Sequence, residues 1–376
     1  MPAPRAGLCV ALVLAALGAV LCACQERGPA AAPALTLRPV SFAGLGGWAD
    51  DNAAGAIPAF LKSCRVFLAE PDDRPLDPAV SSGDFGTVGE WRGPCAAAEK
   101  LPGTDAAAKE FFETGFVPLL AGNRGDSQGR FTGYFEIVLN GSRRQEGPFQ
   151  TPIYRRPPDP KASSRAEIEA GALAGKKLEL AWLDDPIGAY FLTVQGSGQI
   201  RLNTGGAIRV GYDGKNDRPY VGLGRLLVER GEIPLPQLTM DTLRAWITSH
   251  GDAGMALMLE NPSYIFFKEI AGDGPLGTEQ VALTARRSLA VDRDFVPLGV
   301  PLWLDVEQRF IAGATRRLVI AQDTGGAIKG PVRGDFYWGS GDAAGNAAGA
   351  TNATGRYYLL LPRAVAARTL ASVSGD

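Results

Sequence analysis

The chain has 376 residues, 45% of them hydrophobic and 21% charged, and a formal net charge of −2. That length is enough for two domains with hydrophobic cores, and the lack of a basic patch argues against nucleic acid as a partner. The single histidine, His250, lies in a polar stretch without a second histidine to form a zinc pair, so we expect it at the surface. Carboxylates remain as the natural proton carriers.

Residues 1–24 form the first predicted element, an export signal. Arg5 precedes an apolar run at 8–20 that is too short for a permanent membrane-spanning helix. The run ends in Leu-Cys-Ala-Cys, which resembles the lipobox of bacterial lipoproteins, whose last cysteine is lipidated. This resemblance predicts lipidation at Cys24, and plain secretory cleavage after Ala23 is the alternative.

Gln25, directly after the lipobox-like sequence, resembles the outer-membrane sorting pattern. It predicts an outer-membrane lipoprotein that faces the periplasm and is held to the membrane by its lipid. Residues 25–40 are predicted to be a tether, because residues 25–33 (QERGPAAAP) consist largely of proline, alanine and glycine.

Cys64 and Cys95 are the two cysteines that remain after the signal and the lipid site. An even pair in an exported, oxidising setting predicts a disulfide. Closing a loop of about 32 residues would stabilise the fold by roughly 3 kcal/mol in the chain-entropy model. Two buried free thiols are the alternative, and neither interpretation makes these cysteines catalytic.

The periodicity of apolar residues predicts helices first, then strands, then both again. The expected helices are at 56–70, around Trp91, at 105–116, from a capping box at Ser164, and at 223–231, 240–249 and 253–260. The expected strands are at 131–139, 149–154, 178–183, 189–195, 199–202, 281–288, 300–306, 318–321 and 357–361. Many short strands with glycine and proline turns favour a barrel or a sandwich.

Two glycine-containing stretches interrupt the strand patterns. Asn140-Gly141 is typical of a hairpin turn. Residues 194–198, Val-Gln-Gly-Ser-Gly, have two interpretations: a β-bulge, or a groove floor over which a polymer passes closely.

Residues 318–339 hold the main candidates for chemistry. Asp323 ends a short apolar run and is followed by Gly325-Gly326, so a ligand can approach it closely. Asp335 stands directly before Phe336, Tyr337 and Trp338. A carboxyl group beside aromatics can lose solvation and hold its proton near neutral pH, as a general acid must. The alternatives are an Asp that only shapes a turn and an Asp at a solvated strand edge.

Seven stretches together resemble the membrane-bound lytic murein transglycosylase A family. They are FTGYFEIVLNGSRRQEGPFQTPIYRRPP, SRAEIEAGAL, VQGSGQIRL, GRLLVERGEI, NPSYIFFK, AVDRDFVPLG and DTGGAIKGPVRGDFYWGSG, in the family's order. The last two also resemble the 3D module, named for three aspartates, which here would be Asp292, Asp323 and Asp335.

The resemblance implies a mainly β fold with helices, in which a double-psi β-barrel carries an inserted second β-rich, barrel-like domain with a cleft between them. The barrel and the N-terminal helices would comprise 41–136 and 271–376, and the inserted substrate-binding domain would comprise 137–270. Ligand sites favour such junctions.

The resemblance also implies cleavage of the β-1,4 bond between N-acetylmuramic acid and N-acetylglucosamine in peptidoglycan, leaving a 1,6-anhydromuramoyl end. One carboxyl group suffices, so Asp335 would act as general acid and then as base, with no metal and no cofactor. The resemblance implies peptidoglycan glycan strands as the binding partner, and it allows membership in a cell-wall remodelling complex.

Supporting roles are expected for Asp323 and Asp292, each with a purely structural role as the alternative. Substrate contacts are expected from a larger set: Gln195, Ser197, Gly198, Tyr134, Lys329 and Tyr337. For Lys329 an exposed turn position is the alternative, and for the tyrosines a place in the core.

Three rival functions remain open on the sequence. Asp323-Thr324-Gly325 is the signature of aspartic proteases, but one copy lacks the second aspartate that such a site needs. A hydrolytic β-glycanase on the same barrel would need Asp342 or Asp292 as its base. A non-catalytic peptidoglycan-binding lipoprotein would keep the cleft and tolerate the loss of Asp335.

Overall fold

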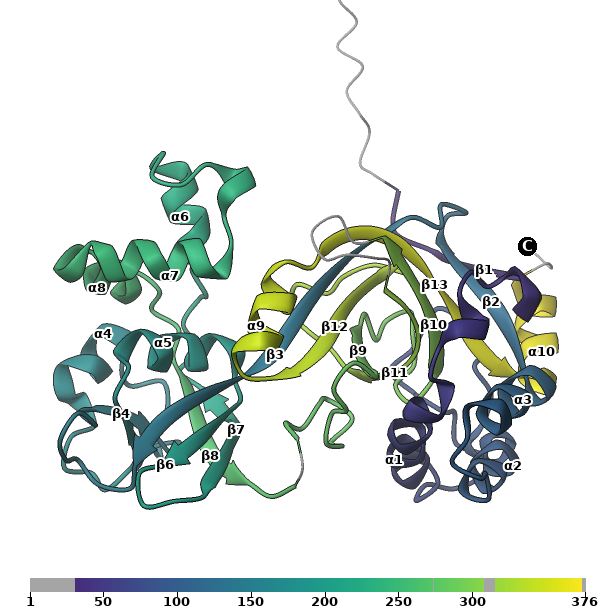
Figure 1. Cartoon of the computed structure of the whole chain (residues 1–376), viewed down its shortest axis with the longest axis horizontal. Helices are drawn as coiled ribbons and strands as arrows, with labels where there is room; N and C mark the ends of the chain where they lie inside the picture. The colour runs from purple at the N-terminus through teal and green to yellow at the C-terminus, as the bar shows by residue number, and fades with distance from the viewer. Residues whose placement is uncertain (1–30, 273, 308–314, 374–376) are drawn as a thin grey trace, which may run out of the picture. The chain divides into compact units, whose positions relative to one another are not determined.

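The computed structural model describes residues 31–272, 274–307 and 315–373 (Figure 1). The predicted export signal, Cys24 and the first residues of the tether lie outside these ranges. From Pro33 onward the chain forms one unit by its backbone contacts. In the described ranges, no helix has the length and apolar character needed to cross a membrane.

The strands are joined edge to edge into one continuous network. The strands of the described residues are β1 (Leu35–Pro39), β2 (Phe116–Asn123), β3 (Gly129–Ser142), β4 (Thr151–Tyr154), β5 (Glu179–Leu183), β6 (Gly198–Leu202), β7 (Ala207–Lys215), β8 (Ile265–Ile270), β9 (Ser288–Val291), β10 (Pro301–Glu307), β11 (Thr315–Asp323), β12 (Arg333–Ser340) and β13 (Asn352–Pro362). Their main order is β1-β2-β13-β10-β11-β9-β12-β3-β6-β7-β8.

The barrel strands combine parallel and antiparallel pairs. β12 runs parallel to β3, and β11 runs parallel to β9, while β9 and β12 pair antiparallel. β13 pairs antiparallel with β10, β2 and the first residues of β3. Buried apolar side chains of these strands, among them Trp303 and Leu360, form one core with those of the N-terminal helices.

Ten α-helices accompany these strands in the described part of the chain. They are α1 (Ile57–Phe67), α2 (Val88–Glu99), α3 (Asp105–Gly115), α4 (Arg165–Glu167), α5 (Pro186–Gln195), α6 (Leu223–Glu229), α7 (Met240–Ser249), α8 (Gly251–Leu259), α9 (Asp342–Gly349) and α10 (Arg363–Val373). The predicted helices at 56–70, around Trp91 and at 105–116 match α1, α2 and α3. A disulfide between Cys64 and Cys95 joins α1 to α2.

β3 connects the barrel to a second hydrophobic core. Its first half pairs with β12, and from Ile137 onward it pairs with β6 (Figure 1). Strands β5 to β8 and helices α5 to α8 contribute buried residues to this second core, which includes Leu192, Ile200 and Phe267. The domain boundaries at 137 and 270 stay a prediction.

The predicted hairpin turn at Asn140-Gly141 is wrong, because both residues lie inside β3. Gly141 pairs with Leu202 of β6 on one side and with Leu183 of β5 on the other. A Cβ atom at Gly141 would lie 2.5 Å from Cγ2 of Ile200 and 3.0 Å from the Trp182 carbonyl oxygen. The glycine therefore allows close strand packing instead of a turn.

The predicted strand at 189–195 is also wrong, because these residues form most of α5. The Asp185 side chain accepts a hydrogen bond from the Gly188 amide at the N-terminus, and Pro186 takes the first helical position. A continuous apolar run does not distinguish a buried strand from a buried helix. Neither is the stretch 194–198 a β-bulge, since Gly196 ends α5 with φ 81° and β6 begins at Gly198.

The predicted strand at 281–288 is wrong for most of its length. Only an isolated bridge between Leu276 and Ala282 forms there, and β9 begins at Ser288. Leu283 of this segment lines the cavity described next.

Candidate active site

Asp335 lies on β12, between two strands that come from distant parts of the chain. Its Cα partner on β3 is Thr132 and its partner on β9 is Ala290. The Thr132 hydroxyl donates a hydrogen bond of 2.6 Å to Oδ1 of Asp335. Nη2 of Arg333 donates to the same hydroxyl oxygen at 2.7 Å, so the threonine is held with its proton toward the carboxylate.

The environment of Asp335 favours the protonated acid. Burial raises the pKa of Asp335, and the nearby Asp323 raises it further, whereas the Thr132 hydrogen bond and the Arg333 charge lower it. Burial is the largest of these causes, so the pKa lies above its ordinary value. Among the described residues, no side chain or amide donates to Oδ2 of Asp335. That oxygen is available to a ligand.

Asp323 ends β11 and has both carboxylate oxygens occupied. Its Oδ1 accepts from the amide and the hydroxyl of Thr278 at 2.9 and 3.0 Å, and from the Thr324 amide at 2.9 Å. Its Oδ2 accepts from the Tyr134 hydroxyl at 2.9 Å. Burial raises the pKa of Asp323, and these hydrogen bonds lower it. Asp323 is thus positioned as a fixed group that organises the loop from Thr278 and the turn after β11.

Both aspartates line one cavity of about 550 Å³. Its wall is contributed by the barrel strands, by the turn after β11, by the 275–283 segment and by the second β-rich part. The sequence-predicted residues in this wall are Tyr134, Gln195, Ser197, Asp323, Asp335 and Tyr337.

The two predicted tyrosines lie beside each other. Tyr134 and Tyr337 are register partners on β3 and β12, and their ring centroids are 5.2 Å apart at an angle of 45°. Burial and the nearby Asp323 raise the pKa of Tyr134, so its hydroxyl stays a hydrogen-bond donor to Asp323. Burial raises the pKa of Tyr337 to about 12.

Three sequence-predicted residues lie outside the cavity wall. Asp292 is buried and accepts from the Gly330 amide at 2.7 Å and from Nζ of Lys329 at 3.3 Å. Lys329 therefore contacts Asp292 and not Asp335. A Cβ atom at Gly198 would lie 2.5 Å from Cδ1 of Leu192, so this glycine allows β6 to pack against α5.

Sequence reasoning missed several residues of the site. Thr132 donates to Asp335 from the neighbouring strand β3, Arg333 holds Thr132 from two residues before Asp335 on β12, and Thr278 holds Asp323 from a loop. Tyr212 and Lys268 line the cavity from β7 and β8. Except for Arg333, these residues lie far from the aspartates in the sequence, and the fold brings them to the site. The aromatic–glycine pattern FTGY was the available signal for Thr132.

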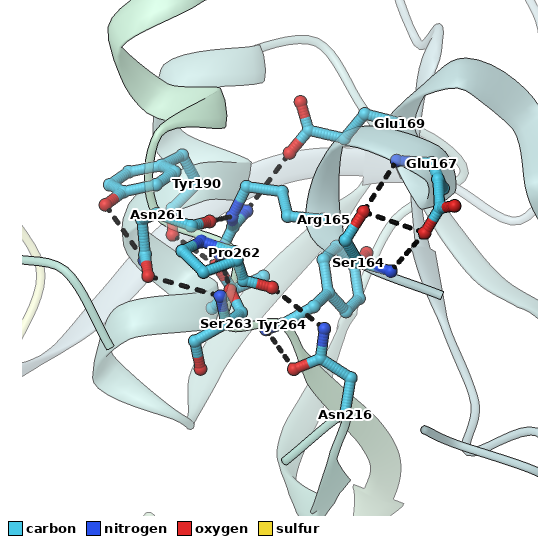
Figure 2. A network of polar contacts seen from close by, with 11 residues as sticks. Ser164, Arg165, Glu167, Glu169, Tyr190, Asn216, Asn261, Pro262, Ser263 and Tyr264 are labelled. Carbon is cyan, nitrogen blue, oxygen red and sulfur yellow. Dashed lines mark hydrogen bonds and ion pairs between the residues drawn. The ribbon is translucent and has the colours of Figure 1, made fainter. Parts of the chain in front are cut away.

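A buried arginine, Arg165, lies at the centre of a network of polar contacts (Figure 2). Arg165 donates to the carbonyl oxygens of Asn261 and Ser263 at 3.0 and 2.7 Å, to the Thr193 hydroxyl at 2.6 Å and to Glu169 at 3.1 Å. Because Thr193 belongs to the last turn of α5, this network fixes the turn that carries Gln195 into the cavity wall.

The described residues contain no group of three or more His, Cys, Asp or Glu side chains that could hold a metal ion. A β-barrel cavity with two part-buried aspartates, tyrosines and an amide side chain is typical of enzymes of the glycan-cleaving class, whose acid–base groups are carboxyls.

Comparison with known proteins agrees with this class. The family model described as the MltA specific insert domain matches residues 130–268, and the 3D domain model matches residues 287–361. The chain is similar to membrane-bound lytic murein transglycosylase A of Escherichia coli strain K12, with 39% identity over 249 residues, covering 64% of this chain and 67% of that protein. The chain belongs to the membrane-bound lytic murein transglycosylase A family.

Solved structures confirm the predicted fold class. The membrane-bound lytic murein transglycosylase from Agrobacterium tumefaciens is 30% identical with a TM-score of 0.77, covering 89% of this chain and 99% of that chain. The structure of Escherichia coli MltA with bound chitohexaose is 30% identical with a TM-score of 0.67, covering 89% and 92%. The β-rich fold with helices, a double-psi β-barrel joined to a second β-rich part, is thus shared with the family.

Proposed function

We propose that this chain is a lytic transglycosylase that cleaves the β-1,4 bond between N-acetylmuramic acid and N-acetylglucosamine in peptidoglycan. The product would carry a 1,6-anhydromuramoyl end. The observation that carries the mechanism is the contrast between the two aspartates. Asp335 has one donor on Oδ1 and, among the described residues, none on Oδ2, while both oxygens of Asp323 accept hydrogen bonds. Asp335 is therefore the group suited to exchange a proton with a substrate.

In the first step, Asp335 as a neutral acid gives its proton to the glycosidic oxygen, and the bond from that oxygen to C1 of the muramic acid breaks. Burial, which raises the pKa of Asp335, supports the protonated form at the start. The departing sugar leaves with a hydroxyl group. Asp335 is now a carboxylate facing the positively charged C1 centre.

In the second step, the Asp335 carboxylate takes the proton from the C6 hydroxyl of the same muramic acid, and the oxygen bonds to C1. This closes the 1,6-anhydro ring and returns Asp335 to its acid form. The nucleophile is part of the substrate, so little translational entropy is lost in the attack. Arg333 and Thr132 would position Asp335 during both steps, and Asp323 would hold the loop at Thr278 in place.

We assign substrate contacts to Gln195 and Ser197 at the end of α5 and to Tyr134 and Tyr337 on the barrel. All four line the cavity that holds Asp335. The chitohexaose bound to the Escherichia coli relative supports a glycan chain as the ligand type. Residues 137–270, the proposed inserted domain, would form one side of the groove for the strand.

We also propose that the chain is an outer-membrane lipoprotein anchored at Cys24. The name of the relative as membrane-bound supports membrane association. Labelling cells with a radioactive fatty acid tests this proposal. A Cys24→Ala variant should lose the label and leave the outer-membrane fraction, and a variant that keeps both would contradict the anchor.

The reaction is tested with purified protein that starts after Cys24. It would be incubated with peptidoglycan, and the released muropeptides would be weighed by mass spectrometry. An Asp335→Asn variant of unchanged circular dichroism and melting temperature serves as the control. Products one water lighter than reducing muropeptides, absent with the variant, are the expected result.

Two other outcomes separate the rival functions. Reducing ends from the unaltered protein would mean hydrolysis, with Asp323 as the other carboxyl group among the described residues of the cavity wall. No release, with binding of peptidoglycan intact, would mean a non-catalytic wall-binding lipoprotein.

A further inference from the structure

The charges in the cavity wall are unevenly distributed. Of the described residues in that wall, Lys268 is the one with a positively charged side chain, and Asp323 and Asp335 are the ones with carboxyl groups. Lys268 belongs to β8, in the second β-rich part, while both aspartates belong to the barrel. A cation in this wall favours ligands that carry a negative charge at that position.

Lys268 has room for such a ligand. Its register partner on β7 is Gly211, which has no side chain, and the next residue, Tyr212, has 52% of its surface exposed. Both Gly211 and Tyr212 line the same cavity. The Ile270 side chain packs over the Gly211 backbone and also lines the cavity, so a sugar can lie against this apolar wall with its charged substituent near the ammonium group.

The ion pair that Lys268 forms within the chain, with Asp213, is weak. Nζ of Lys268 lies 3.7 Å from Oδ1 of Asp213, beyond hydrogen-bond distance, and the two side chains are 57% and 34% exposed. Ion pairs of this kind contribute little, because water screens them. A carboxylate from a ligand can therefore compete with Asp213 for the lysine.

We propose that Lys268 is a specificity-determining residue that recognises a carboxylate on the substrate strand, so that the cavity prefers muramoyl glycans to neutral chitin-type glycans. This inference rests on the proposed function. Each N-acetylmuramic acid carries a lactyl ether whose carboxyl group is either free or joined to a peptide with carboxylates of its own. N-acetylglucosamine has no such group. The lysine thus recognises the chemical difference between the two alternating sugars.

The test measures binding by calorimetry with three ligands, in the Asp335→Asn background so that none is cleaved. The ligands are neutral chitohexaose, peptide-free murein strands with free lactyl carboxylates, and strands that keep their peptides. Lys268→Gln should weaken binding of the anionic strands about five-fold and leave chitohexaose unchanged. The anionic ligand that loses more affinity identifies the source of the carboxylate.

Asp213→Asn gives a change in the opposite direction. It removes the competing carboxylate, so binding of the anionic strands should become tighter while chitohexaose stays unchanged. Lys100→Gln, an exposed lysine at the end of α2 and outside the cavity wall, is the control for charge alone. Raising the salt concentration should shrink the effect of Lys268→Gln. Equal weakening for all three ligands, or no weakening for any, would overturn the proposal.

Failure of this inference is distinguishable from failure of the proposed function. If the chain with its natural Lys268 releases no anhydro products, the reaction is wrong, whatever the binding data show. If it releases them, and Lys268→Gln leaves KM and kcat on peptidoglycan unchanged, only the role of Lys268 is wrong. The expected result is a higher KM with kcat nearly unchanged.

Discussion

Asp323 and Asp335 lie on opposite sides of one small residue, Ala290. Strand β9 runs between β11 and β12, and Ala290 is the Cα partner of both aspartates. Two strand spacings separate their backbones by about 10 Å, and the alanine between them leaves the space above it open to the cavity. The two carboxyl groups thus face one cavity from separate strands, so each can have different hydrogen-bond partners.

Thr132→Val tests how Asp335 is positioned. The threonine hydroxyl donates to Asp335 and lowers its pKa, so the variant should raise that pKa and loosen the carboxyl group. A hydrogen bond to a charged group contributes about 1.5–3 kcal/mol, so we expect kcat to fall about ten-fold or more. The acid form is the active one at the start, so the basic limb of the profile of kcat/KM against pH should move to higher pH.

Thr132→Ser is the matched control, because it keeps the hydroxyl. It should restore both kcat and the position of the basic limb. A valine variant with an unchanged pH profile would show that Thr132 does not act on Asp335.

Sequence patterns identified the aspartates but not their surroundings. Asp323 and Asp335 stood out because glycines and aromatics flank them locally in the chain. Thr132 and Lys268 did not, since their relation to the site depends on β3 pairing with β12 and β8 pairing with β7 across long sequence separations. Local patterns carry no information on which distant strands become neighbours.

The same limit explains the errors at glycines. The sequence around Gly141 has the composition of a turn, and only the strands on both sides of it keep it extended. The apolar run 189–195 has the composition of a buried strand, and its helix depends on the cap at Asp185 and on packing around all its faces. Burial on every side removes the periodicity from which a prediction is made.

Gly198→Ala distinguishes a packing glycine from a substrate-binding one. The new Cβ would lie 2.5 Å from Leu192, 2.8 Å from Ile137 Cγ2 and 3.0 Å from the Ile137 carbonyl oxygen. Overpacking of this kind costs typically about 1–3 kcal/mol, so the free energy of unfolding should fall by that amount. Denaturant titration measures it. A direct role in binding would instead raise KM and leave the unfolding free energy unchanged.

Glu279 should make the stability of the fold depend on pH. The pKa of Glu279 is raised from 4.5 to about 8, mainly by burial. The nearby Asp77 also raises this pKa, whereas the hydrogen bonds from Ser63 and Gln322 and the charge of Arg293 lower it. Between these two values the folded chain binds more protons at this site than the unfolded chain. The free energy of unfolding should therefore fall as pH rises through the window, by a few kcal/mol in order of magnitude.

Glu279→Gln is the comparison for that measurement, because glutamine is neutral at every pH. Denaturant titrations across the window should give a smaller fall for the variant than for the natural chain. Asp323 and Asp335 have raised pKa values too and act in the same direction, so some fall should remain. Parallel curves for the two proteins would contradict a buried, proton-binding Glu279.

Arg165→Lys should separate support of the cavity wall from the chemistry at Asp335. Lysine keeps the charge but lacks the planar set of donors, so it cannot serve the carbonyl oxygens of Asn261 and Ser263, Thr193 and Glu169 together. Arg165→Met removes the charge as well, and loss of one partner from a buried network of this kind costs about 3–5 kcal/mol. Denaturant titration should rank the unaltered chain above the lysine variant and the methionine variant last.

Under conditions where the lysine variant stays folded, its KM for peptidoglycan should rise, because the last turn of α5 carries Gln195 to the cavity. Its kcat should change little, because Asp335, Thr132 and Arg333 stand on barrel strands that the network does not touch. A fall in kcat equal to the rise in KM would instead mean that Arg165 supports the whole site.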